Sequence, residues 1–225
     1  MTLNLKQLRN VKADHTLPLY VELPAHSTQL LLHLKRQNAS QPAYYKSRYG
    51  WVMGLASARH DADYRYAVPF QKGKKVRVSQ GFNGKTSHNG YSRYAVDFAV
   101  PVGTPVYAAR EGKVVATRAS GSKGALKRGY GKYANYIVIE HSDGTFGKYY
   151  HLKKQGVAVR VGERVKQGDL IGYSGNTGYS SGPHLHFSVS KVDPQYKQRP
   201  VTVPFLLQTA TGVVRNVKRG DRYIR

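Results

Sequence analysis

The chain has 225 residues, of which 40% are hydrophobic, enough for one large domain or two small ones with a genuine core. It contains 36 Lys and Arg against 12 Asp and Glu, a formal net charge of +24, which indicates an anionic partner or surface. The absence of cysteine excludes disulfides and thiolate metal sites. No apolar run reaches the roughly 18 residues of a membrane-spanning helix, so we expect no transmembrane segment.

Nucleic acid is one anionic partner that would suit this charge. The sequence has no zinc-finger spacing, no ribonucleoprotein motif and no basic helical pattern, so we expect no nucleic acid. Anionic polysaccharide, phospholipid or lipopolysaccharide fits the charge equally well.

Residues 1–69 are predicted to form a small β-rich N-terminal module. Residues 17–23 alternate as a strand does, residues 29–35 form a second apolar run, and residues 37–42, between these runs and Tyr44, have the composition of a turn. The histidines of this part are irregularly spaced and lack carboxylates at useful distances, so we interpret them as structural or surface residues. They are His15, His26, His33 and His60.

Residues 70–225 are predicted to form a second, mainly β domain built on an antiparallel sheet. Residues 136–140 have the pattern of a strand, Asp143-Gly144 is a hairpin turn signal, and residues 147–152 have the pattern of the return strand. Residues 119–132 are polar and glycine-rich, which predicts an exposed loop. Strands at this short spacing, joined by glycine turns, indicate an antiparallel sheet or sandwich.

Two candidate metal ligands stand in the stretch from Ser181 to Phe187. His184 and His186 are two residues apart in a strand-like run, so their side chains would share a face. Zinc prefers histidine nitrogen, but a His-x-His pair alone is a weak signal. Asp97 lies within the apolar run 94–100, where a buried carboxylate must be paired or metal-bound. A solvent-facing or turn-closing Asp is an equally good interpretation of that residue alone.

Residues 74–190 resemble the lysostaphin-type, or LytM-like, zinc metallopeptidases, which cleave bacterial cell-wall peptides. Many blocks in the same order make this resemblance far more specific than the His-x-His pair. The blocks are Gln80-Gly81, His88, residues 95–106, residues 108–115, Tyr150-His151-Leu152, residues 161–168, residues 171–178 and residues 182–187.

The resemblance implies a LytM-like catalytic domain that binds one zinc ion per chain through His88, Asp97 and His186. It implies that His151 and His184 serve the chemistry without binding metal. Strand geometry alone leaves the reverse assignment open, with His184 as ligand and His186 free. It also leaves open which of His151 and His184 is the general base. The interval between His88 and Asp97 is longer than is commonest in the family.

The predicted ligand set suits catalysis. Two nitrogens and one oxygen would leave a fourth tetrahedral position for water, the open form of a catalytic zinc site. Asn176 and Tyr133 are candidate substrate-binding residues, although turn and core roles are the favoured alternative. His141 flanks the predicted hairpin turn, and we expect it to be non-catalytic.

The predicted function is therefore a zinc endopeptidase that hydrolyses cross-links or stem peptides of bacterial peptidoglycan. The D-alanyl–diaminopimelate bond is the expected target, because the sequence lacks the SH3-type wall-binding module found beside some glycyl-glycine endopeptidases. The alternative is a non-catalytic wall-binding or regulatory LytM-like module, in which the ligands are usually lost, whereas here all five site residues are present.

The expected partners are peptidoglycan and anionic wall polymers. Such a substrate lies outside the cytoplasm, so we expect export to the periplasm or cell envelope, with a signal segment absent from this sequence. The sequence leaves open the oligomeric state and the role of the N-terminal module, which would be an anchor, a docking element or an autoinhibitory cover.

Overall fold

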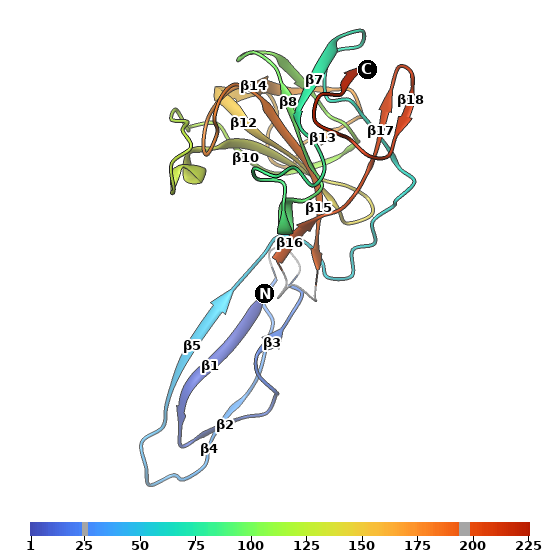
Figure 1. Cartoon of the computed structure of the whole chain (residues 1–225). Coiled ribbons are helices and arrows are strands. Elements are labelled where there is room, and N and C mark those ends of the chain that lie inside the picture. The colour runs from blue at the N-terminus through green and yellow to red at the C-terminus, as the bar shows by residue number, and fades with distance from the viewer. Residues whose placement is uncertain (24–26, 194–198) are drawn as a thin grey trace. The chain divides into compact units, whose positions relative to one another are not determined.

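The computed structural model of the chain describes residues 1–23, 27–193 and 199–225 (Figure 1). These residues form strands joined by turns, with two short 3-10 helices, so the mainly β prediction is confirmed. The chain divides into two compact units, one of Met1–Ala56 with Val192–Arg199 and one of Ser57–Lys191 with Pro200–Arg225. Within the described ranges, neither helix has the length and hydropathy needed to cross a bilayer.

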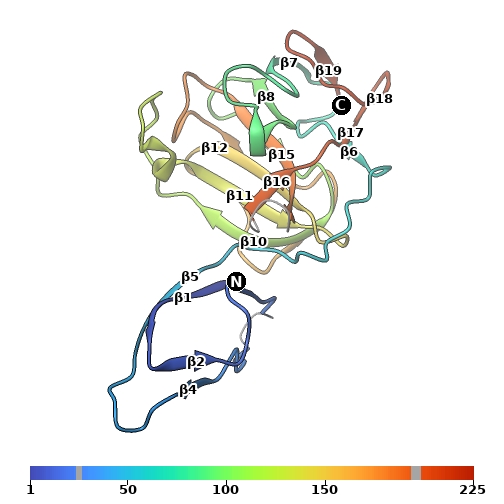
Figure 2. The same cartoon turned by 60° about the horizontal axis from the view of Figure 1, so that its bottom comes forward.

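The first unit is made of antiparallel strands with little buried apolar surface. Its three-stranded sheet has the order β3-β1-β5, and β2 pairs with β4 (Figure 2). Leu5 and Val11 are buried, whereas Tyr49 and Trp51 expose 71% and 74% of their surface. The strands are β1 (Thr2–Arg9), β2 (Val11–Ala13), β3 (Leu19–Tyr20), β4 (Leu34–Arg36) and β5 (Tyr44–Gly50).

The second unit holds the large sheet, whose central path runs β13-β10-β11-β12-β15-β8-β7-β19. Its strands are β6 (Arg65–Ala67), β7 (Lys75–Gln80), β8 (Ala95–Ala99), β9 (Pro105–Tyr107), β10 (Gly112–Arg118), β11 (Asn135–Glu140), β12 (Phe146–Val157), β13 (Arg164–Val165), β14 (Leu170–Ser174), β15 (Leu185–Asp193), β16 (Arg199–Thr202), β17 (Leu206–Thr209), β18 (Gly212–Val214) and β19 (Arg222–Ile224), with short helices η1 (Gly90–Ser92) and η2 (Tyr130–Tyr133).

Residues 65–67, which the sequence assigns to the N-terminal module, belong to the second unit. β6 pairs with β17 in parallel, whereas neighbouring strands along the central path of the large sheet are antiparallel. Tyr66 on β6 is fully buried, and Val68 and Phe70 just after it join the same core. The compact unit therefore begins at Ser57, before the residue-70 boundary that the sequence suggested.

The predicted hairpin is confirmed. β11 and β12 pair in antiparallel register, with Ile139 opposite Gly147, and Gly144 adopts a φ of 78° in the turn between them. A φ in this region is available to glycine at little cost, which explains the Asp-Gly signal. The polar segment before η2 forms a single isolated bridge, between Gly124 and Gly178, and is otherwise irregular, as the loop prediction required.

The core lies on one face of the large sheet, and the candidate site lies on the other. On β15, Leu185, Phe187 and Val189 are fully buried in the core, so His186 and Ser188 between them point to the opposite face. On β8, Val96 and Phe98 enter the same core, which places Asp97 on the face of His186.

Strand register brings four polar residues into one row across this face. Gln80 on β7 is opposite Asp97 on β8, Asp97 is opposite His186 on β15, and His186 is opposite Tyr150 on β12. Because neighbouring strands lie about 4.8 Å apart, residues distant in sequence become adjacent side chains here. The sheet thus assembles the site.

Candidate metal centre and its groove

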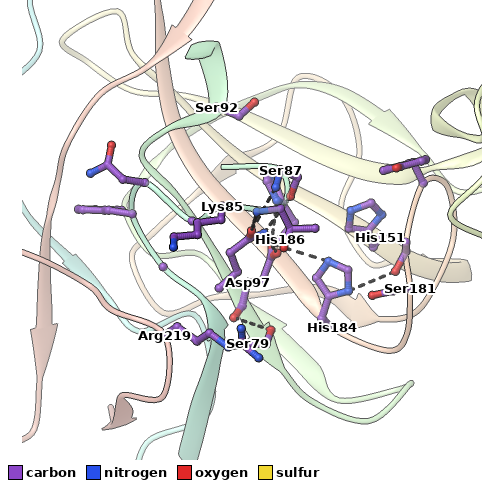
Figure 3. A pocket seen from close by; sticks show the side chains of 18 of the residues that line it. Ser79, Lys85, Ser87, Ser92, Asp97, His151, Ser181, His184, His186 and Arg219 are labelled. Carbon is purple, nitrogen blue, oxygen red and sulfur yellow. Dashed lines mark hydrogen bonds and ion pairs between the residues drawn. The ribbon is translucent and has the colours of Figure 1, made fainter. Parts of the chain in front are cut away.

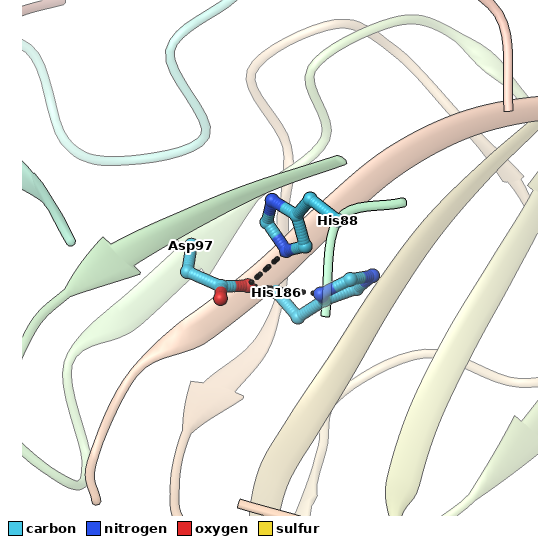
Figure 4. Close-up of side chains that lie close together, drawn as sticks. All are labelled: His88, Asp97 and His186. Atoms are coloured by element: carbon cyan, nitrogen blue, oxygen red, sulfur yellow. Dashed lines mark hydrogen bonds and ion pairs between the residues drawn. The ribbon is translucent and has the colours of Figure 1, made fainter. Parts of the chain in front are cut away.

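Three potential metal ligands converge at one point of this face. His88, Asp97 and His186 each offer a ligand atom, and these atoms all lie within 4.8 Å of one another (Figure 4). Asp97 Oδ1 is 2.9 Å from His186 Nδ1 and 3.2 Å from His88 Nε2. His88 is fully buried and Asp97 nearly so. This is the trio that the sequence predicted.

His88 is held in one tautomer by the backbone. Its Nδ1 lies 2.9 Å from the carbonyl oxygen of Gly81, which only an N–H can satisfy, so Nε2 carries the lone pair in the neutral ring. Nε2 has no hydrogen-bond partner and faces a carboxylate oxygen. Two acceptors facing each other in a buried position are best satisfied by a cation between them. Gly81 itself cannot carry a side chain, because a Cβ there would lie 2.2 Å from Val217 O.

Asp97 is oriented by further hydrogen bonds. Burial alone would raise its pKa, but the hydrogen bond from His186, with the His88 imidazole close by, holds the pKa of Asp97 well below its usual range. Gln80 Nε2 donates to the second carboxylate oxygen, Oδ2, at 2.9 Å, and Ser79 Oγ donates to the backbone oxygen of Asp97 at 3.1 Å. The carboxylate therefore remains ionised and fixed in position.

His151 reaches the site through a β-bulge. Tyr136 pairs with Tyr150 but Asn135 pairs with Leu152, so His151 is the extra residue, and its φ is 66°. Bulges re-aim side chains, and non-glycine residues at positive φ are strained and concentrate at functional sites. Its Nδ1 lies 2.7 Å from the carbonyl oxygen of Thr177, which leaves Nε2 as the free acceptor. Burial, with the neighbouring His184 and His186, lowers the pKa of His151 to about 3.

His184 stands beside His151, at 4.6 Å between ring centroids. Its Nδ1 lies 2.8 Å from the carbonyl oxygen of Gly182 and 3.2 Å from Ser180 Oγ. Nε2 therefore points towards the metal centre, 3.7 Å from Asp97 Oδ1. His184 Nε2 and His186 Nδ1 thus both approach Asp97 Oδ1, at 3.7 Å and 2.9 Å, and of the two it is His186 that falls in the group that could hold a metal ion.

The cluster lies in an open groove of about 730 Å³. Asp97, His151, His184 and His186 line it, and so do three basic residues, Lys85, Lys218 and Arg219. In Figure 3, Lys85 and Arg219 lie on one side of the histidines and Ser181 on the other. Asp97 is the sole carboxylate among the described residues that line the groove, so the wall around the centre is basic.

The remaining predicted residues lie away from this groove. Tyr133 ends η2, and neither it nor Asn176 is among the lining residues. Asn176 Oδ1 is buried without a hydrogen-bond partner. His141 is buried behind the hairpin turn and lies 2.8 Å from the carbonyl oxygen of Glu111 through Nδ1. Of the N-terminal histidines, His15, His33 and His60 lie outside the groove, and His26 lies outside the described residues.

Sequence reasoning gave Gln80 no role, although it orients the site. Its Nε2 also donates to Ser87 Oγ at 2.8 Å, and its Oε1 accepts hydrogen bonds from the backbone N–H groups of Thr86 and Ser87. Gln80 thus ties Asp97 to the loop that carries His88. Its sequence signals are its place at the end of an alternating strand and in the Gln80-Gly81 block of the family resemblance, and neither reveals its partners.

The chain is similar to known peptidases. Residues 91–201 match Peptidase family M23, a range that begins just after His88. Peptidoglycan DD-endopeptidase ShyA of Vibrio cholerae is 40% identical over 119 residues, which is 51% of this chain and 25% of ShyA. Lysostaphin of Staphylococcus simulans is 39% identical over 129 residues, which is 55% of this chain and 23% of lysostaphin.

Two solved structures are also similar. A zinc containing peptidase from Vibrio cholerae is 34% identical over 62% of this chain and 39% of that chain, with a TM-score of 0.43. The catalytic domain of lysostaphin from Staphylococcus simulans is 34% identical over 52% of this chain and 78% of that chain, with a TM-score of 0.37.

The match thus spans a minor part of ShyA and of full-length lysostaphin but most of the lysostaphin catalytic domain. The family match over residues 91–201 includes Asp97, His151, His184 and His186, which lie together in the structure. The chain carries a metallopeptidase domain of peptidase family M23.

Proposed function

We propose that the chain is a zinc-dependent endopeptidase that hydrolyses peptide cross-links or stem peptides of bacterial peptidoglycan. The observation that carries this proposal is the convergence of His88, Asp97 and His186 in a groove of an M23 domain, with His151 and His184 beside them. The name of ShyA, a peptidoglycan DD-endopeptidase, favours the D-alanyl–diaminopimelate cross-link as the bond cleaved.

The donor set fits zinc. Zinc takes histidine nitrogen and carboxylate oxygen at about 2.0–2.2 Å, and three protein ligands with one open position are typical of catalytic sites. The buried lone pair of His88 Nε2 facing Asp97 Oδ1 is an arrangement that such a cation would satisfy. When bound, zinc polarises the scissile carbonyl and lowers the pKa of water towards about 7.

The two remaining histidines provide proton transfer and stabilisation of the oxyanion. His151 and His184 both have Nδ1 near a backbone carbonyl, so Nε2 is the reactive atom of each ring. One Nε2 takes the proton of the attacking water and delivers it to the leaving amine. The other, in its protonated form, donates a hydrogen bond to the oxyanion. Each role contributes roughly 10²–10⁴ in rate.

The basic groove suits an anionic polymer. Lys85, Lys218 and Arg219 line it, and the whole chain carries a net charge of +24. Long-range attraction would concentrate the enzyme on peptidoglycan and its associated polymers. Because that substrate lies outside the cytoplasm, the site of action is the periplasm or cell envelope.

The test is mass spectrometry of the products formed from defined muropeptides by the zinc-loaded full chain. We expect cleavage of a D-alanyl–diaminopimelate cross-linked dimer into its monomers, and no cleavage by the His186→Ala variant. A protein that holds zinc stoichiometrically yet leaves every muropeptide and purified sacculi uncut would show that it is a binding or regulatory module instead.

A further inference from the structure

A second hollow adjoins the groove on the same face of the sheet. It has a volume of about 250 Å³ and shares His151 and His186 with the groove. Lys148, Ser188 and Ser190 form its floor, from the strands β12 and β15 that carry the two histidines. The hollow therefore continues the site along the sheet.

Strand register fixes how far Lys148 lies from the metal centre. Lys148 pairs with Ser188, two residues along the strands from the pair of Tyr150 and His186. Two residues along a strand span about 6.8 Å, and both pairs point to the same face. The four-carbon stem of a lysine covers such a distance, so its ammonium group reaches ligands bound beside His186.

Lys148 is a desolvated cation without a counter-charge. Its ammonium group makes no hydrogen bond or ion pair with any residue that the structure describes, and no carboxylate lines the hollow in those ranges. Burial lowers the pKa of Lys148 to about 8. Ser190 beside it is 2% exposed, and its Oγ has no hydrogen-bond partner either. Buried polar groups are normally satisfied, so these two are groups that a ligand would satisfy.

We propose that Lys148, assisted by Ser190, binds a free carboxylate that the substrate carries next to the scissile bond. This inference rests on the proposed peptidase function. Of the side chains that line the hollow, an ammonium group and a hydroxyl are the natural partners of a carboxylate, which accepts hydrogen bonds from both.

The D-alanyl–diaminopimelate cross-link supplies such a group. The carbon attached to its scissile nitrogen bears the free carboxylate of diaminopimelate, three bonds from the carbonyl carbon that is attacked. A glycyl-glycine bridge has no carboxylate there. Lys148 is therefore a specificity-determining residue that selects the first substrate over the second.

The experiment compares two synthetic cross-linked dimers that differ only at this group, one with the carboxylate and one with a carboxamide. Lys148→Met keeps an unbranched side chain, one atom shorter, and removes its charge. We expect it to lower kcat/KM for the carboxylate dimer roughly tenfold to a hundredfold, the range of a hydrogen bond to a charged group. We expect less than about a threefold change for the carboxamide dimer, and Lys148→Arg to restore most of the difference.

The exposed Lys113 on β10 lines neither hollow, so Lys113→Met is the matched control for loss of one positive charge. Equal loss on both dimers, or no loss on the carboxylate dimer, would overturn the role of Lys148. If the wild-type protein cuts neither dimer, the peptidase function fails instead. Calorimetric binding of the two uncut dimers then still tests the subsite, which is refuted if the carboxylate dimer binds no more tightly than the carboxamide dimer.

Discussion

His88 Nε2 lies 3.2 Å from Asp97 Oδ1, while the other nitrogen of the same ring is engaged by the Gly81 carbonyl oxygen. The backbone thereby directs a lone pair at a carboxylate in a buried position. Such a contact is unfavourable in the metal-free protein, and it becomes favourable once a divalent cation lies between the two atoms. Hydrogen bonds of the protein itself thus preorganise the candidate metal centre.

We expect the purified chain to bind close to one zinc ion and His186→Ala to bind none. Binding to the folded state alone stabilises a protein by about 2.7 kcal/mol at a ligand concentration a hundred times Kd. Zinc should therefore raise the Tm of the wild-type protein and not that of the variant. The exposed His33 provides the control variant His33→Ala, which should behave as wild type. Stoichiometric zinc in His186→Ala would disprove this ligand assignment.

Gln80→Ala should weaken zinc binding although Gln80 offers no ligand atom. Its amide holds Asp97 through Oδ2 and the His88 loop through Thr86 and Ser87. Loss of such supporting contacts typically costs roughly 10–100-fold in metal affinity. A zinc titration against a competing chelator measures this. Gln208→Ala, which removes a hydrogen bond to Thr209 O at a residue that does not line the groove, is the control, and equal affinities for the two variants would contradict the prediction.

His151→Gln and His184→Gln should each lower kcat roughly 10²–10⁴-fold while zinc stays bound. The reason is that each variant loses a titratable Nε2 and keeps the bulk of the side chain. Elemental analysis on the same samples separates this from metal loss. If His184→Gln released the zinc and His186→Ala did not, the reverse ligand assignment would be correct.

The sequence predicts the proximity of Asp97 and His186 better than the position of His151. Asp97 and His186 stand on strands whose alternation places them on one face, so their proximity follows once the sheet is assumed. The position of His151 does not follow, because a bulge shifts the register of β12 by one residue and no residue pattern marks it. Lys148 was also not predicted, since its lack of a partner depends on which strands flank it.

The assignment of β6 to the second unit could not be predicted from the sequence either. The aromatic segment around Tyr66 has the composition of a linker to a second domain, yet its strand pairs with residues 206–208, which lie far along the chain. Such a long-range parallel pairing leaves no local signal, because it depends on tertiary packing of Tyr66 against Phe205 and Phe187.

Asn135→Ala should destabilise the second unit strongly. Asn135 is fully buried, its Oδ1 accepts from Gly121 N at 2.7 Å, and its Nδ2 donates to Gly121 O and Leu152 O. Truncation leaves these buried backbone groups without the hydrogen bonds of Asn135, and we expect it to lower the free energy of unfolding by about 3 kcal/mol. Urea unfolding measures the change. The exposed Asn216 supplies the control Asn216→Ala, which should lie within about 0.5 kcal/mol of wild type. A similar small change for Asn135→Ala would refute the account.

The buried His141 should make stability depend on pH. Burial, with the nearby Arg110 charge, lowers the pKa of His141 from 6.5 to about 4, although its hydrogen bond to Glu111 O opposes this. Above pH 6.5 the ring is neutral in both the folded and unfolded states and contributes nothing to the pH dependence. Between 6.5 and about 4 the unfolded chain takes up a proton that the folded chain does not, so stability falls as the pH falls. The total loss from this group is roughly 3 kcal/mol at most.

His141→Asn isolates this contribution. An Asn side chain places its amide N–H where Nδ1 now donates to Glu111 O, but it does not titrate. We expect the variant to be less stable near neutral pH, because a smaller side chain leaves a cavity, and to lose less stability on acidification. Urea unfolding in the presence of a chelator removes any zinc contribution, and the shifted pKa of His151 acts equally in both proteins and cancels. His33→Asn is the control at an exposed site, and it should keep the wild-type slope. If His141→Asn has the wild-type slope as well, His141 is not the group that couples folding to pH.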